Sequence, residues 1–163
     1  MRTRAVFESI TSPSSIALTH ESLPRCDRYG TTIWSPLQFG ILTGKYNNGV
    51  PKGSRFDVNS DFFQNTADAL NTPEGQVKIN KVKALTKLAE EKLGCKTATL
   101  AIAWTALNPN VSTCILGASS LEQLQENLKA LEVLPKLTPE VVAEIEKILD
   151  NKPDMGPAKR PLN

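Results

Sequence analysis

Apolar residues recur at every third or fourth position after residue 72, which is the spacing of a helix face. Thr72, Pro73 and Glu74 supply an N-cap, a proline in the first turn and an early acidic residue. Gly94 closes this helix, and its apolar face consists of Ile79, Val82, Leu85, Leu88 and Ala89. We therefore predict a long amphipathic helix with a lysine-rich outer face.

A second amphipathic helix is predicted after Thr97. The pair Asn108-Pro109 terminates it. Its apolar residues have the spacing i, i+3, i+4 and i+7, and they are Leu100, Ala103, Trp104 and Leu107. Trp104 is therefore expected in the core.

Two more helices complete the second half of the chain. Ser119 or Ser120 can cap the first, and Glu122 or Gln123 can complete a capping box. The expected inner face of this helix is Leu121, Leu124, Leu128 and Leu131. The last helix begins at Thr138-Pro139-Glu140. It is expected to bury Val142, Ile145 and either Ile148 or Leu149.

Two runs of β-branched and apolar residues predict short buried strands. The first is Thr31-Thr32-Ile33-Trp34, which stops at Pro36 because proline lacks the backbone donor. The second covers residues 112–116 and runs into the turn Gly117-Ala118-Ser119-Ser120.

Other segments lack a sustained period. Residues 5–10 have the composition of a strand, and residues 21–29 predict a short helix that ends at Gly30. Residues 37–71 are rich in glycine, and we expect a long loop with one or two helical turns. Such a loop usually covers a site or binds something, and partial disorder is the alternative. We expect one domain over residues 21–150, between an unassigned segment (1–20) and a proline-rich tail (151–163).

Strands that alternate with helices indicate an α/β fold with parallel strands. Ligands in such folds bind at the carboxyl ends of the strands. Two loops fall there, residues 35–55 and residues 117–120. The second loop precedes a helix, whose N-terminal N–H groups favour a phosphate. A serine at this place is more often only a helix cap.

Composition excludes several classes of protein. The chain has 163 residues, 40% of them hydrophobic and 22% charged, which suits one domain with a sizeable core. Its apolar runs are too short to cross a bilayer. Lysine and arginine exceed the acidic residues by a net charge of only +2, without a basic stripe. We expect a soluble, cytosolic protein that does not bind nucleic acid.

Common catalytic and metal motifs are absent from the sequence. Cys26, Cys95 and Cys114 are an odd, widely spaced set, and with His20 alone they suit neither a disulfide framework nor a zinc site. Residues 40–45 have glycines one residue too close for a P-loop, with Tyr46 where its Ser or Thr belongs. No GxGxxG follows a strand, so a Rossmann fingerprint is missing as well.

Three separated motifs resemble the aldo-keto reductase superfamily. They are WSPLQFGILTGKYNNGVPKGSR (residues 34–55), LAIAWTALNPNVSTCILGASS (residues 100–120) and EQLQEN (residues 122–127). The resemblance covers residues 23–153, including VLPKLTPEVVAEIEKILDNKP at the end. It is closest to the branch that contains voltage-gated potassium channel β-subunits.

The resemblance implies the C-terminal units of a (β/α)8 barrel that binds NADP(H) at its carboxyl face. The resemblance implies that four residues lie along the cofactor, namely Trp34, Ser35, Pro36 and Leu37. It also implies that two cations, Lys45 and Arg55, face the phosphates of the cofactor. Those implied to hold the adenosine-side phosphate are Gly117, Ser119 and Gln123, and those implied for the adenine are Glu126 and Asn127. Many reductases carry a lysine and an arginine where this chain has Ala118 and Gln123, so a charge-based preference for the 2′-phosphate is less secure here.

Length also departs from the family. A complete barrel needs about 250 residues, so we expect this chain to be a C-terminal half. The family's catalytic Asp, Tyr, Lys and His lie in the other part, and neither Tyr29 nor Tyr46 stands in that motif. We carry over no catalytic residue. Unpaired strand edges and an exposed barrel-facing surface are unfavourable in isolation. We therefore expect a truncated gene product, an alternative start, or a half that assembles as an oligomer or with a complementary polypeptide.

Three functional hypotheses follow. The first is the cofactor-binding part of an NADP(H)-dependent reductase, whose complete form reduces aldehydes or ketones by hydride transfer. The second is a non-catalytic interaction protein that senses bound nucleotide and docks on a membrane channel. The third is a remnant without function.

Overall fold

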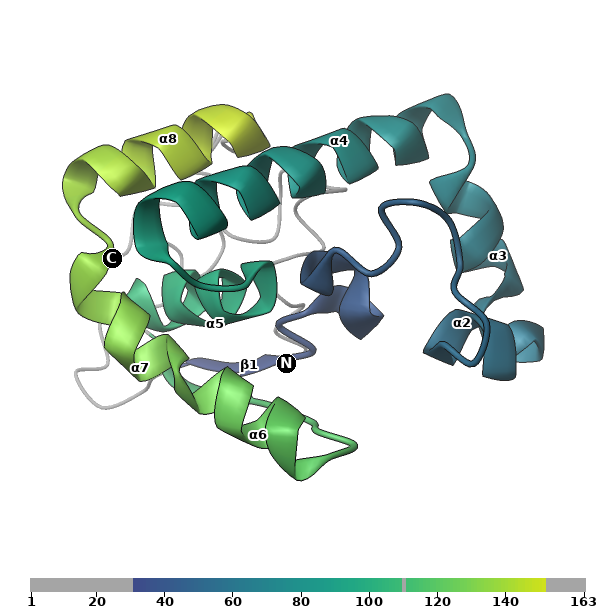
Figure 1. The fold of residues 1–163 in the computed structure, drawn as a ribbon, viewed down its shortest axis with the longest axis horizontal. Coiled ribbons are helices and arrows are strands. Elements are labelled where there is room, and N and C mark those ends of the chain that lie inside the picture. The colour runs from purple at the N-terminus through teal and green to yellow at the C-terminus, as the bar shows by residue number, and fades with distance from the viewer. Residues whose placement is uncertain (1–30, 110, 152–163) are drawn as a thin grey trace, which may run out of the picture.

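Two short parallel strands organise the structure. The computed structural model describes residues 31–109 and 111–151 (Figure 1). Strand β1 (Thr31–Trp34) pairs with β2 (Val111–Ile115), with Ile33 opposite Cys114 and Trp34 opposite Ile115. The described part is therefore a mostly helical α/β structure with a small sheet, in agreement with the predicted class. These two strands do not by themselves establish a barrel.

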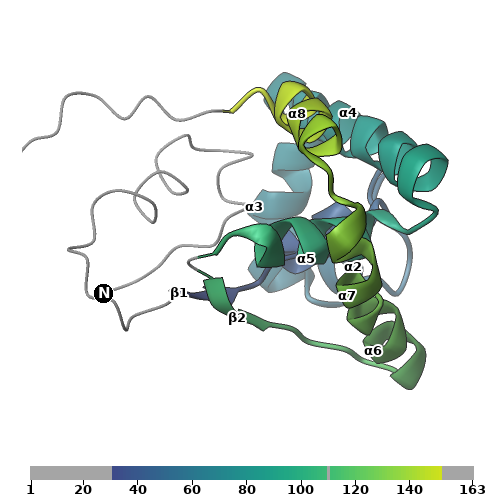
Figure 2. The same ribbon diagram turned by 90° about the vertical axis from the view of Figure 1, so that its left-hand side faces the viewer.

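Helices cover one face of this sheet, and in Figure 2 the described helices lie to one side of β1 and β2. Ile33 is 1% exposed and Cys114 is half-buried. Trp34 and Ile115, on the opposite face, are 47% and 52% exposed. The prediction of two buried strands was therefore correct for one face and wrong for the other, because successive strand residues point to opposite sides.

The segment after β1 is far more ordered than the predicted long loop. It contains the 3-10 helix η2 (Gln38–Thr43), α2 (Arg55–Val58) and α3 (Ser60–Leu70). Its core is aromatic: Tyr46 stacks on Phe56 with ring centroids 4.3 Å apart, and Phe63 lies 5.1 Å from Phe56 and 5.2 Å from Phe39. These rings come from several short elements, so their positions show no common period.

Helix α4 (Pro73–Leu88) and its π-helical continuation η3 (Ala89–Leu93) confirm the first predicted helix. The Thr72 hydroxyl accepts a hydrogen bond from the Gly75 N–H at 3.1 Å. Gly94 ends the helix in the left-handed region with φ 62°. The predicted apolar face is buried.

Helix α5 (Thr97–Leu107) is the central helix, and the prediction that it is amphipathic was wrong. It contacts β2, α4, α6, α7 and η2, so most of its surface is covered. The buried residues include Thr97, Thr99 and Thr105 as well as the apolar positions. Trp104 packs against the core only partly buried, and Leu107 is 38% exposed.

Helices α6 (Leu121–Leu128) and α7 (Ala130–Val133) correct another prediction. The side that is buried carries Asn127, Ala130 and Val133, and both helices contact α5. The leucines expected on the inner face are instead 64%, 43%, 53% and 69% exposed; they are Leu121, Leu124, Leu128 and Leu131. Spacing identified an apolar face correctly, but α5 covers a different one.

The chain then passes through the short helix η4 (Leu134–Lys136) into α8 (Pro139–Leu149), which confirms the last prediction. Thr138 accepts from the Val141 N–H, and Ile145 and Leu149 are buried. Lys81 of α4 donates to the Leu149 carbonyl, which joins α8 to α4. The expected strand and helix before residue 31 lie outside the described residues. Within the described part, no helix combines the length and apolarity that a membrane span requires.

The corner between α3 and α4 depends on Gly75. A Cβ atom there would lie 2.0 Å from the Ala69 carbonyl oxygen and 2.7 Å from the Leu70 backbone. Although alanine favours a helix, we expect Gly75→Ala to lower the free energy of unfolding by about 1–3 kcal/mol, because the backbone must shift. Urea denaturation followed by circular dichroism measures this loss. Gly117→Ala is the control: its Cβ would meet nothing within 4 Å, so the change should stay within about 0.5 kcal/mol. Equal effects would contradict the steric argument.

Candidate functional site

The carboxyl ends of β1 and β2 lie side by side. Trp34 is opposite Ile115 in the parallel register, so the turns after both strands leave the sheet at the same end. The first turn begins with Ser35, Pro36 and Leu37, and the second contains Gly117 and Ser119. The structure thus brings the two predicted groups of site residues to one edge.

The turn after β1 holds an unusual backbone conformation. Ser35, Gln38 and Phe39 have φ values of 52°, 47° and 57°, the left-handed region that side chains other than glycine rarely adopt. The Ser35 carbonyl accepts from the Gln38 N–H at 3.0 Å, and Pro36 is buried. Each such residue costs on the order of 1 kcal/mol or more and persists only where packing imposes it. This concentration of strain marks the turn as a candidate binding loop.

Two cations lie on the aromatic cluster beside this turn. The Arg55 guanidinium is 5.6 Å from the Phe39 ring and 5.4 Å from the Phe63 ring. The Lys45 ammonium is 4.9 Å from the Tyr46 ring. Such cation–π contacts orient a side chain and leave its donors free for an anion. Because Phe39 belongs to the turn after β1, Arg55 is tied to the same loop as Ser35.

The turn after β2 is held by a network within α6. The Ser120 hydroxyl accepts from the Gln123 N–H at 3.3 Å, so Ser120 is the N-cap. The Gln123 side-chain oxygen accepts from both the N–H and the hydroxyl of Ser119, each at 3.0 Å. The predicted cap at Ser120 is therefore confirmed, whereas the Gln123 side chain bonds to Ser119, one residue before the N-cap whose N–H a capping box uses. The network fixes the start of α6, where N–H groups without intrahelical partners favour an anion.

Glu126 forms a second polar cluster one turn further along α6. Its carboxylate accepts from the Thr99 hydroxyl at 3.1 Å and lies 3.1 Å from the Lys129 ammonium and 3.3 Å from that of Lys96. The hydrogen bond from Lys129 lowers the pKa of Glu126; partial burial opposes this, while Thr99 and Lys96 lower it further. Glu126 is therefore ionised at neutral pH. Asn127 beside it is 6% exposed.

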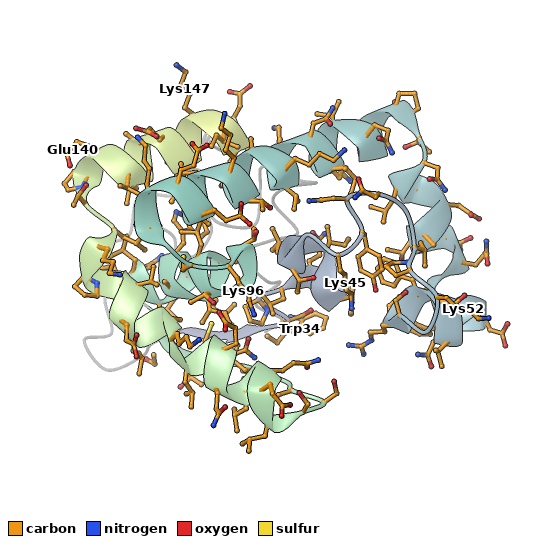
Figure 3. All side chains as sticks on the ribbon, viewed as in Figure 1. Trp34, Lys45, Lys52, Lys96, Glu140 and Lys147 are labelled. Atoms are coloured by element: carbon orange, nitrogen blue, oxygen red, sulfur yellow. The ribbon has the colours of Figure 1, made fainter. Side chains whose placement is uncertain are left out.

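Sequence reasoning did not single out Lys96, Thr99 or Lys129. Lys129 follows Glu126 at the i, i+3 spacing of a helical ion pair, which was a readable signal. Lys96 and Thr99 lie at the start of α5, and their approach to α6 is a tertiary contact. Figure 3 labels Lys96, Trp34 and Lys45 in the middle of the view, with Lys147 at the edge formed by α8.

Other reactive groups of the described part do not form a site. Tyr46 is 2% exposed, stacked on Phe56, and its buried hydroxyl has no hydrogen-bond partner. Burial raises the pKa of the Cys95 and Cys114 thiols, with Lys136 opposing and Glu126 adding to the effect at Cys95. Both thiols are thus protonated at neutral pH. No group of metal-ligating side chains occurs among the described residues.

An apolar crevice between α4, α5 and α8 is a poor alternative site. Its lining is Leu85, Thr97, Leu100, Ala101, Trp104, Ile145 and Leu149. The Thr97 hydroxyl already pairs with that of Thr86 at 2.8 Å, and the lining carries no charge. The crevice therefore has nothing to hold an anionic ligand.

Comparisons with known proteins find sequence similarity over most of the chain. Residues 20–150 match the sequence model of the aldo/keto reductase family. The chain is 51% identical over 125 residues to a putative voltage-gated potassium channel subunit beta of Schizosaccharomyces pombe, covering 77% of this chain and 35% of that protein. It is 46% identical over 125 residues to a probable voltage-gated potassium channel subunit beta of Arabidopsis thaliana, covering 76% and 36%. The chain thus spans about a third of the length of these relatives.

Glu126→Gln tests the electrostatic role of this carboxylate. Because its folded pKa lies below the unfolded value, the charge stabilises the fold above the ordinary glutamate pKa, and this contribution is lost as the pH falls through the folded pKa. We expect the variant to be less stable at pH 7 by about 1 kcal/mol or less, since the lysines are exposed, and to converge with the wild type towards about pH 3. Urea denaturation across this range measures the difference.

Glu91→Gln is the matched control. Glu91 pairs with Lys87 at 3.9 Å with both side chains exposed, so its replacement should change the free energy of unfolding less than Glu126→Gln does at pH 7. A difference between wild type and Glu126→Gln that grows on acidification would contradict the assignment.

Proposed function

The chain belongs to the aldo/keto reductase family, and from this premise we propose that its described part binds NADP(H). The observation that carries the proposal is the pairing of Trp34 with Ile115. It puts the strained turn after β1, which carries Phe39 and its contact with Arg55, and the turn that leads into α6 at the same edge of the sheet. A dinucleotide with several negative charges suits such an edge better than a neutral ligand does.

The residues present fit the phosphates of this cofactor. Lys45 and Arg55 are exposed residues, and contacts with the rings of Tyr46, Phe39 and Phe63 orient their charged groups. A Cβ at Gly117 would meet nothing within 4 Å, so the backbone there is open to a close approach. We assign the diphosphate to Lys45, Arg55 and the turn that begins at Ser35.

The two ends of the cofactor would meet different groups. The Trp34 side chain, 47% exposed, offers a ring on which the nicotinamide can stack. The Asn127 amide can both donate to and accept from an adenine edge. Glu126 can accept from the adenine amino group, provided that its contacts with Lys96 and Lys129 leave one lone pair free.

The complete protein would use this cofactor to reduce aldehydes or ketones. NADPH, when bound, supplies the hydride. The described residues bind and orient it, and they offer no tyrosine as proton donor, because Tyr46 is buried against Phe56. A tyrosine that donates the proton would therefore come from outside the described part.

We further propose that the described part corresponds to the C-terminal units of a (β/α)8 barrel. One face of the sheet and the α6–α7 leucines are exposed, which is unfavourable for apolar side chains in water. Additional strands, from a complementary polypeptide or a further copy, would cover the sheet face and pair its edges.

A nucleotide-sensing interaction protein is the second candidate. The names of both relatives, voltage-gated potassium channel beta subunits, favour it. In that case the bound nucleotide reports redox state to a membrane channel, and reduction of carbonyls is not the main activity. Turnover of a simple aldehyde with NADPH favours the enzyme over this alternative.

Titration with NADPH while the fluorescence of Trp34 is recorded tests cofactor binding. We expect saturable quenching, which Trp34→Phe removes although equilibrium dialysis still detects the bound cofactor. Arg55→Met should weaken binding about tenfold, because it loses a charge-assisted contact with the diphosphate. Lys147→Met, on α8 at the far edge of Figure 3, is the matched control and should bind normally. A wild-type chain that binds no NADPH by dialysis would overturn the proposal.

A further inference from the structure

Two lysines converge on one carboxylate beside the adenosine end of the proposed site. Lys96 precedes α5 and Lys129 follows α6, yet both ammonium groups approach the same Glu126 oxygen, Oε2, at 3.3 and 3.1 Å. The lysine side chains are 72% and 56% exposed, whereas that of Glu126 is 19% exposed. The less exposed carboxylate thus orients the two ammonium groups, and the lysine side chains remain accessible to solvent.

The charges of this cluster do not cancel. Two ammonium groups face one carboxylate. Lys136 is a further cation in this region, since Lys136 lowers the pKa of Cys95 while Glu126 raises it. Each ammonium has three N–H donors, so it can keep its contact with Glu126 and still bind another anion. A simple surface ion pair has one cation for each anion. This cluster has two lysines for one glutamate, so its net charge is positive.

The cluster lies close to the predicted position of the adenosine-side phosphate. Gln123, Glu126 and Asn127 share one side of α6 through their i, i+3, i+4 spacing, and Glu126 is about 4.5 Å along the axis from Gln123. At the two positions where many reductases have cations, this chain has Ala118 and Gln123. The Gln123 amide is neutral, and its oxygen already accepts two hydrogen bonds from Ser119.

We propose that Lys96 and Lys129, held by Glu126, recognise the 2′-phosphate of NADP(H) and distinguish it from NAD(H). This inference rests on the proposed cofactor site and names the residues that determine its specificity. The 2′-phosphate is a monoester with a charge of about −1.5 to −2, which matches the excess positive charge. Thr99 supports the arrangement by its hydrogen bond to Glu126 from α5. The Asn127 amide, which is 6% exposed, remains assigned to the adenine.

Adenosine 2′,5′-bisphosphate and adenosine 5′-monophosphate differ only in the 2′-phosphate, so their ratio of affinities isolates this contact. Isothermal titration of the full chain should give a clear preference for the bisphosphate. In the double variant Lys96→Met, Lys129→Met we expect the affinity for the bisphosphate to fall about tenfold. The affinity for the monophosphate should change less than about twofold. Arginine at both positions should restore the preference. Phosphorus-31 NMR should show that the 2′-phosphate signal, and not the 5′-phosphate signal, loses its binding shift in the methionine variant.

The control pair Lys87→Met, Lys147→Met removes the same charge from α4 and α8 and should leave the ratio unchanged. An unaltered ratio in Lys96→Met, Lys129→Met, with both nucleotides still bound, would overturn this inference and leave the cofactor site standing. A selective loss in Lys45→Met instead would assign the 2′-phosphate to the other cluster. A wild-type chain that binds neither nucleotide would overturn the proposed function together with the inference.

Discussion

The pairing of β1 with β2 is the interaction on which the candidate site depends. Parallel strands that share a register send their following turns to the same edge, so the backbone hydrogen bonds between residues 31–34 and 111–115 set the positions of Ser35 and Ser119 together. Ile33 and Cys114 lie on the covered face of this pair, and α5 contacts β2. Loss of that packing would separate two loops that are about 80 residues apart in the chain.

Around this edge, the charged groups are oriented by different means. Aromatic rings position Lys45 and Arg55, which requires the stacked core of Tyr46, Phe56 and Phe63. A partly buried carboxylate positions Lys96 and Lys129. Both arrangements orient cations through side-chain contacts, and the second brings two cations to one carboxylate oxygen. The carboxylate offsets the repulsion between these two like charges.

The apolar residues left in solvent have a common origin. Trp34 and Ile115 face away from the helices, and the α6 leucines face away from α5. Each belongs to a segment whose other side is buried: Ile33 and Cys114 lie on that side of the strands, and Asn127, Ala130 and Val133 on that side of α6 and α7. Elements of this kind are typical of the interior layers of larger α/β structures, where both faces are covered. The exposed surfaces and the membership of the aldo/keto reductase family are consistent with each other.

Local signals determined much of this protein. The strands at residues 31–34 and 111–115, the helix starts at Thr72 and Thr138 and the Ser120 cap follow from nearest neighbours, because caps and turns use hydrogen bonds within a few residues. Motifs in the right order also identified the family. The sequence did not predict the features that depend on which surfaces are buried. Helix α5 is enclosed, α3 is ordered by an aromatic cluster, and the α6 leucines are exposed.

Periodicity states that a helix has an apolar face, but which face is covered depends on neighbours that are distant in the chain. The same limit applies to the site. Its residues after each strand could be named from the sequence, whereas the approach of Lys96 to Glu126 exists only because α5 and α6 pack against each other. Sequence by itself determined the elements and the family, and tertiary packing alone decided which charges meet, since a contact between remote residues leaves no local pattern.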